Sequence, residues 1–359
     1  MIIATLAAAI GCAVQEEEAS PALQKLQAAV DQGRTMYAMQ DAVCYGKDWH
    51  PAPGDLSTIE RSDVADVCGD LPAIIGFDLG EIEYQTGHNI DGVYFDYMRA
   101  AALKHAEKGG IVTLSWHMRN PLTGGDAWDV SSDKVVASVL EGGECHETFM
   151  SWLSLAADFI DSLRLEDGSL IPIIFRPWHE NTGSWFWWGE DLCTDEQYQA
   201  LWQLTYDCLV KERGLEGMAW AYSPSSTLLK ECAMGRYPGD EILDIIGVDR
   251  YYMAHVQTLD EGFIRAFRED LEFLSGVAQE HGLLLAVTET GQEGGETADW
   301  WTAGILDSIE GLGVSYVLTW RNAWDKEGHF FAPYTGAPCE QDFVKFYKSP
   351  KTIFLNDLQ

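Results

Sequence analysis

The sequence has 359 residues, of which 47% are hydrophobic, so the chain can bury a large core. It carries 57 acidic and 23 basic residues, which gives a formal net charge of −34. This excess repels nucleic-acid phosphates and anionic lipids, so we expect neither as a partner, and it favours a neutral or cationic substrate. Such acidity is typical of a saline habitat, and a soluble extracellular surface explains it almost as well.

The first residues form an apolar, Ala-rich stretch, Met1 to Ala13, which ends in Ala9-Ile10-Gly11-Cys12. It is too short to cross a membrane as a helix, and the small residue before Cys12 is typical of a bacterial lipoprotein cleavage site. We therefore expect residues 1–20 to be a signal or lipoprotein-like segment, with Cys12 lipidated. The usual basic start is missing, and a frayed apolar terminus is the alternative. The segment therefore predicts an exported protein, located in the periplasm, at the cell surface or outside the cell. We expect this lipid anchor to be its only contact with a membrane.

The seven other cysteines form no CxxC pair and have no metal-ligand spacing with histidine, so we expect no structural zinc and no other metal or cofactor. Cys193 and Cys232 follow successive predicted strands and are the one candidate disulfide. Cys208 lies in an apolar helical pattern, which predicts a buried thiol.

Eight short apolar runs recur along residues 21–359, each followed by a polar loop and a helical pattern. The runs are Thr35 to Met39, Ala73 to Phe77, Ile111 to Trp116, Ile171 to Phe175, Met218 to Tyr222, Ile245 to Val248, Leu283 to Val287 and Val314 to Leu318. The clearest helical patterns are Val93 to Lys108, His146 to Leu163, Thr194 to Lys211, Glu261 to His281 and Ala298 to Glu310. No glycine-rich dinucleotide motif, linker or repeat is present. This alternation predicts an α/β protein, a single-domain (β/α)8 TIM barrel, which we expect to be a monomer.

The run that ends at Phe175 leads into a segment rich in tryptophan, Arg176-Pro177-Trp178-His179-Glu180 and Gly183-Ser184-Trp185-Phe186-Trp187-Trp188-Gly189. Aromatic rings around Glu180 should disfavour its anion and raise its pKa, as a general acid requires near neutral pH. A tryptophan-rich core with a buried, paired glutamate is the structural alternative. Because catalytic groups of such barrels lie at the C-terminal strand ends, we read the other ends for reactive side chains.

The remaining strand ends supply polar and aromatic residues. The third strand ends in His117, the sixth leads into Asp249 and Tyr251, the seventh into Glu289, and the eighth into Trp320 and Arg321. Gln40-Asp41 and Asp78 follow the first two strands, where loop solvation or capping is as good an explanation as a site. Glu180 and Glu289 should therefore face one cleft floored by tryptophan.

Two carboxylates that flank a glycosidic bond can hydrolyse it, one as proton donor and the other as nucleophile. We assign Glu180 as the acid/base because of its tryptophan environment. Glu289 is assigned as the nucleophile, since Arg176 and the Tyr251 hydroxyl can keep it ionised.

At these residues the sequence resembles glycoside hydrolase family 26, known for endo-β-1,4-mannanases. The resemblance covers roughly residues 35 to 348. It rests on His179 directly before Glu180 and on Gly183 to Gly189, Asn120-Pro121-Leu122-Thr123-Gly124-Gly125, Tyr237-Pro238-Gly239-Asp240, Gly247-Val248-Asp249 with Tyr251, and Trp320-Arg321-Asn322. It implies a retaining mechanism with Glu180 as acid/base and Glu289 as nucleophile, held by Arg176 and Tyr251.

The resemblance also implies substrate contacts. His117, His179 and Trp320 would shape the subsite of the attacked sugar, Trp185 would stack the leaving sugar, and Arg321 would bind the next unit towards the non-reducing end. Trp188 and Asp249 are expected at the same substrate site. Gly46-Lys47-Asp48-Trp49 departs from the histidines common in relatives.

The sequence thus predicts a retaining endo-β-1,4-mannanase acting on mannan, glucomannan or galactomannan. A mixed-linkage β-glucanase or β-xylanase of the same family is the alternative, since these differ at subsites rather than in the two glutamates. A non-catalytic glycan-binding protein would have no need of both carboxylates with a supporting Arg and Tyr. A metallohydrolase using His117, His179 and Glu180 is a third hypothesis.

Overall fold

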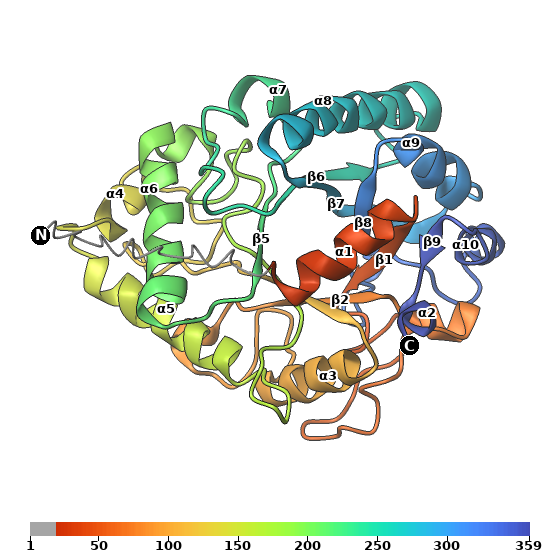
Figure 1. Ribbon diagram of the computed structural model, residues 1–359, viewed down its shortest axis with the longest axis horizontal. Helices are drawn as coiled ribbons and strands as arrows, with labels where there is room; N and C mark the ends of the chain where they lie inside the picture. Colours follow the sequence, from red (N-terminus) through yellow and green to blue (C-terminus); the bar gives the residue numbers. More distant parts are fainter. Residues whose placement is uncertain (1–18) are drawn as a thin grey trace, which may run out of the picture.

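The computed structural model describes residues 19–359, apart from the side chains of residues 260 and 261. Eight parallel strands follow one another around a barrel, and β1 pairs with both β8 and β2, which closes it (Figure 1). The short β9 pairs with the start of β1. The strands are β1 Thr35–Gln40, β2 Ile74–Asp78, β3 Ile111–Ser115, β4 Ile173–Arg176, β5 Ala219–Tyr222, β6 Ile245–Tyr252, β7 Leu284–Gln292, β8 Val314–Thr319 and β9 Thr352–Ile353. All eight predicted strands are present, and the predicted TIM barrel is confirmed.

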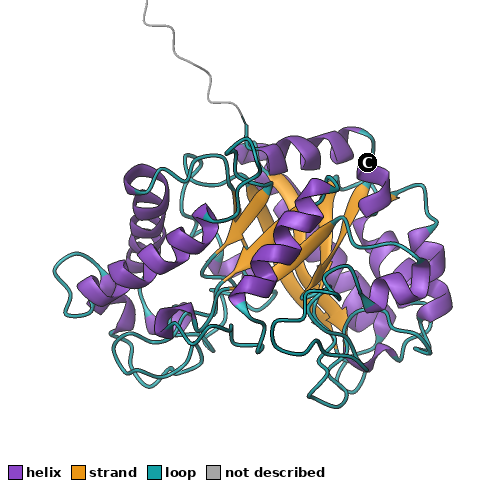
Figure 2. Cartoon of the chain, turned by 90° about the horizontal axis from the view of Figure 1, so that it is seen from below, coloured by secondary structure: helices purple, strands orange, loops and turns teal. Residues whose placement is uncertain are grey.

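Helices surround the strands (Figure 2). The α-helices are α1 Pro21–Asp31, α2 Asp63–Cys68, α3 Phe95–Glu107, α4 Val135–Val139, α5 His146–Asp161, α6 Asp195–Tyr206, α7 Leu229–Cys232, α8 Arg265–His281, α9 Asp307–Ile309 and α10 Glu340–Tyr347. The helix predicted to run to Lys211 changes at its end into π-helix, Asp207–Glu212, and the one predicted from Ala298 is mostly π-helix, Trp300–Leu306. Among residues 19–359 we find no helix long and apolar enough to cross a membrane.

The core has two parts, because each strand buries both faces. Alternate residues such as Tyr37 and Phe175 face the surrounding helices, while smaller ones such as Ala38 and Ile174 fill the barrel interior. Helix α1, which begins at Pro21 behind the capping Ser20, buries Leu26 against this interior. It therefore closes one end of the barrel and leaves the C-terminal strand ends to form the site.

The expected disulfide is absent. Cys193 and Cys232 are both free thiols, and the Cys193 sulfur lies instead 3.6 Å from the Trp188 carbonyl oxygen and 3.5 Å from an Arg236 nitrogen. Cys208 is buried, as predicted. Cys12, and nearly all of the expected N-terminal segment, lie outside the described residues.

Candidate active site

Glu180 stands just beyond the end of β4 on an unusual piece of backbone. Both Trp178 and Glu180 have positive φ angles, 55° and 56°, which non-glycine residues adopt at a cost of about 1–3 kcal/mol. The Glu180 amide donates to the Ser223 carbonyl at 2.6 Å, which ties this turn to the end of β5. The Trp185 indole N–H donates to Glu180 Oε2, also at 2.6 Å. The backbone of Glu180 is thus tied to the end of β5, and its carboxyl group is held by the loop that carries Trp185.

The other tryptophans of this segment lie beneath the site. Trp178, Trp187 and Trp188 are fully buried, and the Trp188 indole donates to the His179 carbonyl at 2.8 Å. With no exposed surface, Trp188 has no face to offer to a sugar, so its expected substrate contact is corrected to a supporting role. Only Trp185 of the four is partly exposed.

Glu289, on β7, is held by two donors. Arg176 forms an ion pair with one of its oxygens, and the Tyr251 hydroxyl donates to the other at 2.6 Å. Arg176 also donates to Asp249 at 3.1 Å, and Asp249 accepts from Ser223 at 2.6 Å. Asp249 and Arg176 are nearly inaccessible, so their expected direct contact with a substrate is corrected. Arg176 instead holds Glu289 from below, and Asp249 pairs with Arg176.

The environments of the two glutamates differ in charge. The pKa of Glu180 is raised well above its usual value, first by burial and then by the negative charges of Asp249 and Glu289. The direction agrees with the sequence prediction, and the cause is refined: the Trp185 N–H lowers this pKa, because it stabilises the anion. Glu180 can therefore keep a proton beside a neighbour whose carboxylate is paired with arginine.

Two histidines form a chain between β2 and β4. Asp78 at the end of β2 bonds His117 Nδ1 at 2.7 Å, and His117 Nε2 lies 3.2 Å from His179 Nε2. Burial lowers the pKa of His117, but the Asp78 carboxylate outweighs it, and the net pKa is raised. Burial and the neighbouring His117 lower the pKa of His179. His117 can thus donate to a neutral His179, so Asp78 belongs to the site rather than to loop solvation.

The eighth strand end contributes a ring and a cation. Trp320 is partly exposed, with its ring centroid 6.3 Å from that of His117. Arg321 pairs with Asp91 at 2.9 Å and donates to the Tyr45 hydroxyl at 3.0 Å. The latter hydroxyl donates in turn to Asp41. Arg321 is thus held rigidly beside Trp320, at the same mouth of the barrel.

Trp128 and Asp91 were missed by the sequence reasoning. Trp128 is 45% exposed and stacks on His117 with ring centroids 5.0 Å apart and planes at 19°. The preceding residue, Ala127, accepts a hydrogen bond from the Trp187 amide at 3.1 Å, which draws the two loops together. Both missed residues lie in loops that have no hydrophobic periodicity. The one signal for Trp128 was a tryptophan in the polar loop after β3, the strand that leads into His117.

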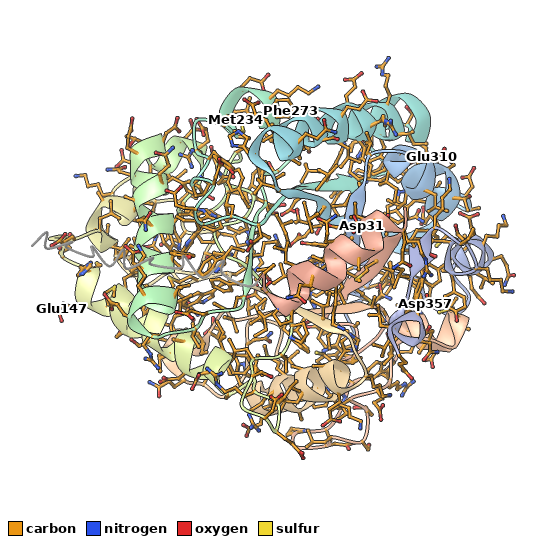
Figure 3. The ribbon with its side chains drawn as sticks, viewed as in Figure 1. Asp31, Glu147, Met234, Phe273, Glu310 and Asp357 are labelled. Atoms are coloured by element: carbon orange, nitrogen blue, oxygen red, sulfur yellow. The ribbon has the colours of Figure 1, made fainter. Side chains whose placement is uncertain are left out.

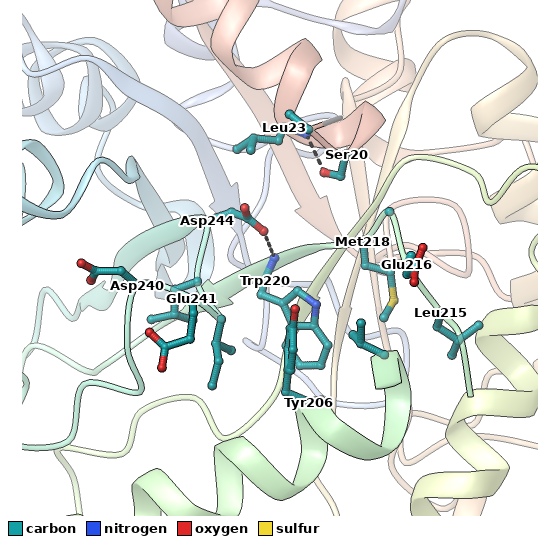
Figure 4. A pocket seen from close by; sticks show the side chains of 15 residues that line it. Ser20, Leu23, Tyr206, Leu215, Glu216, Met218, Trp220, Asp240, Glu241 and Asp244 are labelled. Carbon is teal, nitrogen blue, oxygen red and sulfur yellow. Dashed lines mark hydrogen bonds between the residues drawn. The ribbon is translucent and has the colours of Figure 1, made fainter. Parts of the chain in front are cut away.

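A pocket of about 310 Å³ lies away from these residues, at the opposite end of the barrel. It is lined by Ser20 before α1, by Met218 before β5 and by Asp244 before β6 (Figure 4). These positions are at the N-terminal strand ends, where TIM barrels do not carry their chemistry. We therefore place the functional site at the other end.

The metallohydrolase hypothesis required His117, His179 and Glu180 to converge on an ion. Both histidines instead use a ring nitrogen on each other, and His117 uses its second on Asp78. Among residues 19–359 the side chains close enough together to ligate an ion are Glu180, Asp249 and Glu289, each of which has one oxygen within 4.8 Å of one oxygen of the other two. Two of these are held by Arg176, as expected for a charge-balanced carboxylate pair rather than a cation site.

The chain is a TIM barrel with glutamates at the ends of β4 and β7. An arginine and a tyrosine bind the second glutamate, and exposed tryptophans surround the pair. These features define the class of TIM-barrel glycoside hydrolases. The comparisons narrow the class. The profile of glycosyl hydrolase family 26 matches residues 34–270, and the chain belongs to this family.

Individual relatives are mannanases by name. A mannan endo-1,4-β-mannosidase of Bifidobacterium adolescentis is 32% identical over 317 residues, 83% of this chain, which spans only 31% of that relative's length. The structure of a family 26 β-mannanase from Bacteroides ovatus is 43% identical, with a TM-score of 0.86 over 93% of this chain and 94% of its own. The catalytic domain of a Bacillus sp. JAMB-750 endo-β-1,4-mannanase is 30% identical, with a TM-score of 0.82 over 94% and 93%.

Proposed function

We propose that the chain is a retaining endo-β-1,4-mannanase, with Glu180 as acid/base and Glu289 as nucleophile. The observation that carries this proposal is the proximity of the two carboxylates, since one oxygen of Glu180 lies within 4.8 Å of one oxygen of Glu289. Carboxyl groups about 5–5.5 Å apart allow direct attack on the sugar, whereas inverting enzymes separate them by about 6.5–9.5 Å to admit a water.

The reaction takes two displacements. Glu289 attacks the anomeric carbon while Glu180 gives its proton to the glycosidic oxygen, so the C–O bond breaks and a glycosyl ester with Glu289 forms. Glu180, now ionised, takes a proton from water, which attacks the same carbon and releases Glu289. Arg176 and Tyr251 hold Glu289 in place through both steps, and the raised pKa of Glu180 suits it to the proton transfers.

The partly accessible side chains around the glutamates support the expected substrate positions. His117 and Trp320 would border the attacked sugar, and the buried His179, bonded to His117, would support them from behind. Trp185, partly exposed and bonded to Glu180, would stack the leaving sugar. Arg321, held by Asp91 and Tyr45, would bind the hydroxyls of the next sugar towards the non-reducing end.

Mannan as the substrate is supported by the names of the relatives. The test is reducing-sugar release from linear mannan, galactomannan, lichenan and xylan, measured side by side at equal enzyme loading. We expect mannan to be cleaved fastest. Faster release from lichenan or xylan would instead identify a mixed-linkage β-glucanase or β-xylanase with the same two glutamates.

Export and a monomeric state are further proposals. Export rests on the apolar stretch that ends at Cys12 and on the strongly acidic composition, and the monomeric state rests on the single-domain barrel. Mass spectrometry of the protein purified from membranes would detect acyl chains on Cys12, and an unmodified, uncleaved N-terminus would reject the anchor.

A further inference from the structure

Arg236 is a fully buried arginine outside the group of residues that face the substrate. It lies in the connection between α7 and β6, and Met234, two residues earlier, is at the edge of the molecule (Figure 3). Arg236 turns inward and has no exposed surface. A buried guanidinium is expensive unless its donors are satisfied, so its partners indicate what it is for.

Those partners belong almost entirely to one loop. The guanidinium donates to five carbonyl oxygens between residues 181 and 193, at distances of 2.6 to 3.3 Å: those of Asn181, Trp188, Gly189, Glu190 and Cys193. Its Nε lies 2.8 Å from the Glu190 carboxylate and 3.3 Å from that of Asp195. The charged plane also packs over the Tyr198 ring, 5.0 Å from its centroid. One side chain therefore ties the start of loop 181–193, at residue 181, to its second half, residues 188–193.

This loop carries the hydrogen-bond donor of the acid/base. Trp185 lies in its middle and donates to Glu180 Oε2, and the loop begins directly after Glu180. The loop contains no α-helix or strand, and the 3-10 turn Glu190–Leu192 is its only regular piece. Other hydrogen bonds hold parts of this loop, such as those from the Trp187 indole to the Met118 carbonyl and from the Trp188 indole to the His179 carbonyl. Arg236 is the side chain that joins residue 181 to residues 188–193, and without it these five carbonyls would lose their shared donor.

We propose that Arg236 is a positioning residue for the acid/base: by fixing loop 181–193 it holds the Trp185 indole against Glu180 and so controls proton donation to the leaving sugar. The inference rests on the proposed function, in which Glu180 is the acid. The nucleophile does not depend on this loop, because Arg176 and Tyr251 hold Glu289 from β4 and β6. Loss of Arg236 should therefore impair the acid step and spare nucleophilic attack.

The test compares aryl β-mannobiosides whose leaving groups differ in acidity. For Arg236→Met we expect turnover of mannan to fall about 100-fold, since a misplacement of about 1 Å costs that much. The burst of 2,4-dinitrophenol from its β-mannobioside, which needs no proton donor, should change less than about threefold per active site. Release rates should therefore depend more steeply on leaving-group acidity than in the wild type. Burst amplitude counts the folded sites, so partial unfolding does not affect the comparison.

Two further variants separate positioning from stability. Arg236→Lys keeps the charge but cannot reach five carbonyls, and should show the same leaving-group dependence more weakly. Arg34→Met is the matched control: Arg34 also donates to a backbone carbonyl, that of Thr352 at 2.6 Å, but at the opposite end of the barrel. It should leave the dependence unchanged. Equal losses on all substrates in Arg236→Met would overturn the inference, whereas a wild type inactive on mannan and on the aryl mannobiosides would overturn the proposed function itself.

Discussion

At the scale of single residues, the site makes two chemically identical glutamates different through their neighbours. Glu289 is paired with a guanidinium and accepts a hydrogen bond from a phenol. Glu180 receives a single indole N–H and sits close to two other carboxylates, which disfavour its anion. The proton of the site is therefore expected on Glu180 before the first displacement, and this division can be tested by removing each group in turn.

Glu180→Ala should still release the aryl group from an activated β-mannobioside in a burst and then stall, because the base for the second displacement is gone. Added azide should restart turnover by attacking the glycosyl intermediate. Turnover of mannan, which needs the acid, should fall by about 10²–10⁴-fold. Stopped-flow absorbance measures the burst directly.

Glu289→Ala is the matched variant for this experiment. It should give no burst on the same substrate and no azide rescue through a glycosyl–enzyme ester, because the attacking group is missing. The reverse behaviour of the two variants would exchange their roles.

A second prediction concerns the contribution of the Asp78–His117 pair to the free energy of unfolding. In the folded state the pKa of Asp78 is lowered to about 2 and that of His117 is raised. The Asp78 contribution is present above its unfolded pKa of about 3.9, and the His117 contribution is fully present below about 6.5 and lost as the pH rises through its folded value. Asp78→Asn should therefore lower the free energy of unfolding by about 3 kcal/mol at pH 5, and by less at pH 9.

Urea unfolding of both proteins at the two pH values measures this difference. In a His117→Gln background the effect of Asp78→Asn should lose its pH dependence between 5 and 9. A loss that is equal at both pH values with His117 present would mean that His117 does not change its charge between pH 5 and 9 in the folded protein.

At the scale of elements, the loop after β4 depends on a close approach between two of its own residues. The ring of Trp185 covers Gly183 so closely that a β-carbon there would lie 2.2 Å from ring atoms. Gly183→Ala should therefore push the indole away from Glu180, lower mannan turnover about 100-fold and destabilise the fold by about 1–3 kcal/mol. Steady-state kinetics and thermal unfolding measure the two effects.

Gly276→Ala is the control for this substitution. Gly276 lies in α8, with nothing within 4 Å of the position its β-carbon would take. Activity should be unchanged, and the helix should gain about 1 kcal/mol. Unaltered activity in Gly183→Ala would show that the Trp185 contact is not needed for proton transfer.

The strands could be predicted from the sequence because each one is a continuous apolar run, buried on both faces. Most of their C-terminal ends could be predicted to within one residue, but those of β6 and β7 could not. Strand β6 was predicted to stop at Val248 but continues through polar residues to Tyr252, after an irregularity in its pairing with β7 at Val248 and Asp249. Side chains there are held by site partners such as Arg176, and a hydrophobic pattern does not record such contacts.

The candidate site also contained residues that the strand pattern predicted and residues that depend on loop packing. The two glutamates could be predicted, because a barrel places its strand ends together whatever its loops do. Trp128 could not, since its stacking on His117 depends on how the loop after β3 packs against Trp187. Trp188 was misassigned for a related reason: in a run of neighbouring tryptophans, the sequence does not tell which ring turns inward.

At the scale of the whole molecule, the net charge of −34 should govern how the protein responds to salt. Acidic side chains such as Glu147, Glu310 and Asp357 are exposed, and Glu147 lies at the edge of the molecule in Figure 3. Ion pairs such as Arg213–Asp158 and Lys351–Glu310 are likewise open to water. Mutual repulsion of like charges destabilises a compact state, and salt screens it over about 10 Å at 0.1 M. The substrate, in contrast, is expected to carry no charge.

Stability and substrate binding should therefore respond differently to salt. Raising NaCl from about 0.02 to 0.5 M should raise the Tm by about 5 °C, because screened repulsion favours the folded chain. KM for neutral mannooligosaccharides should stay nearly constant over the same range, since no charge on the ligand is screened. Tetramethylammonium chloride at equal ionic strength is the control, and it should give the same rise if screening is the cause. A Tm that falls with salt would mean that surface ion pairs outweigh the repulsion, and a rise with NaCl alone would point to specific cation binding at the acidic surface instead.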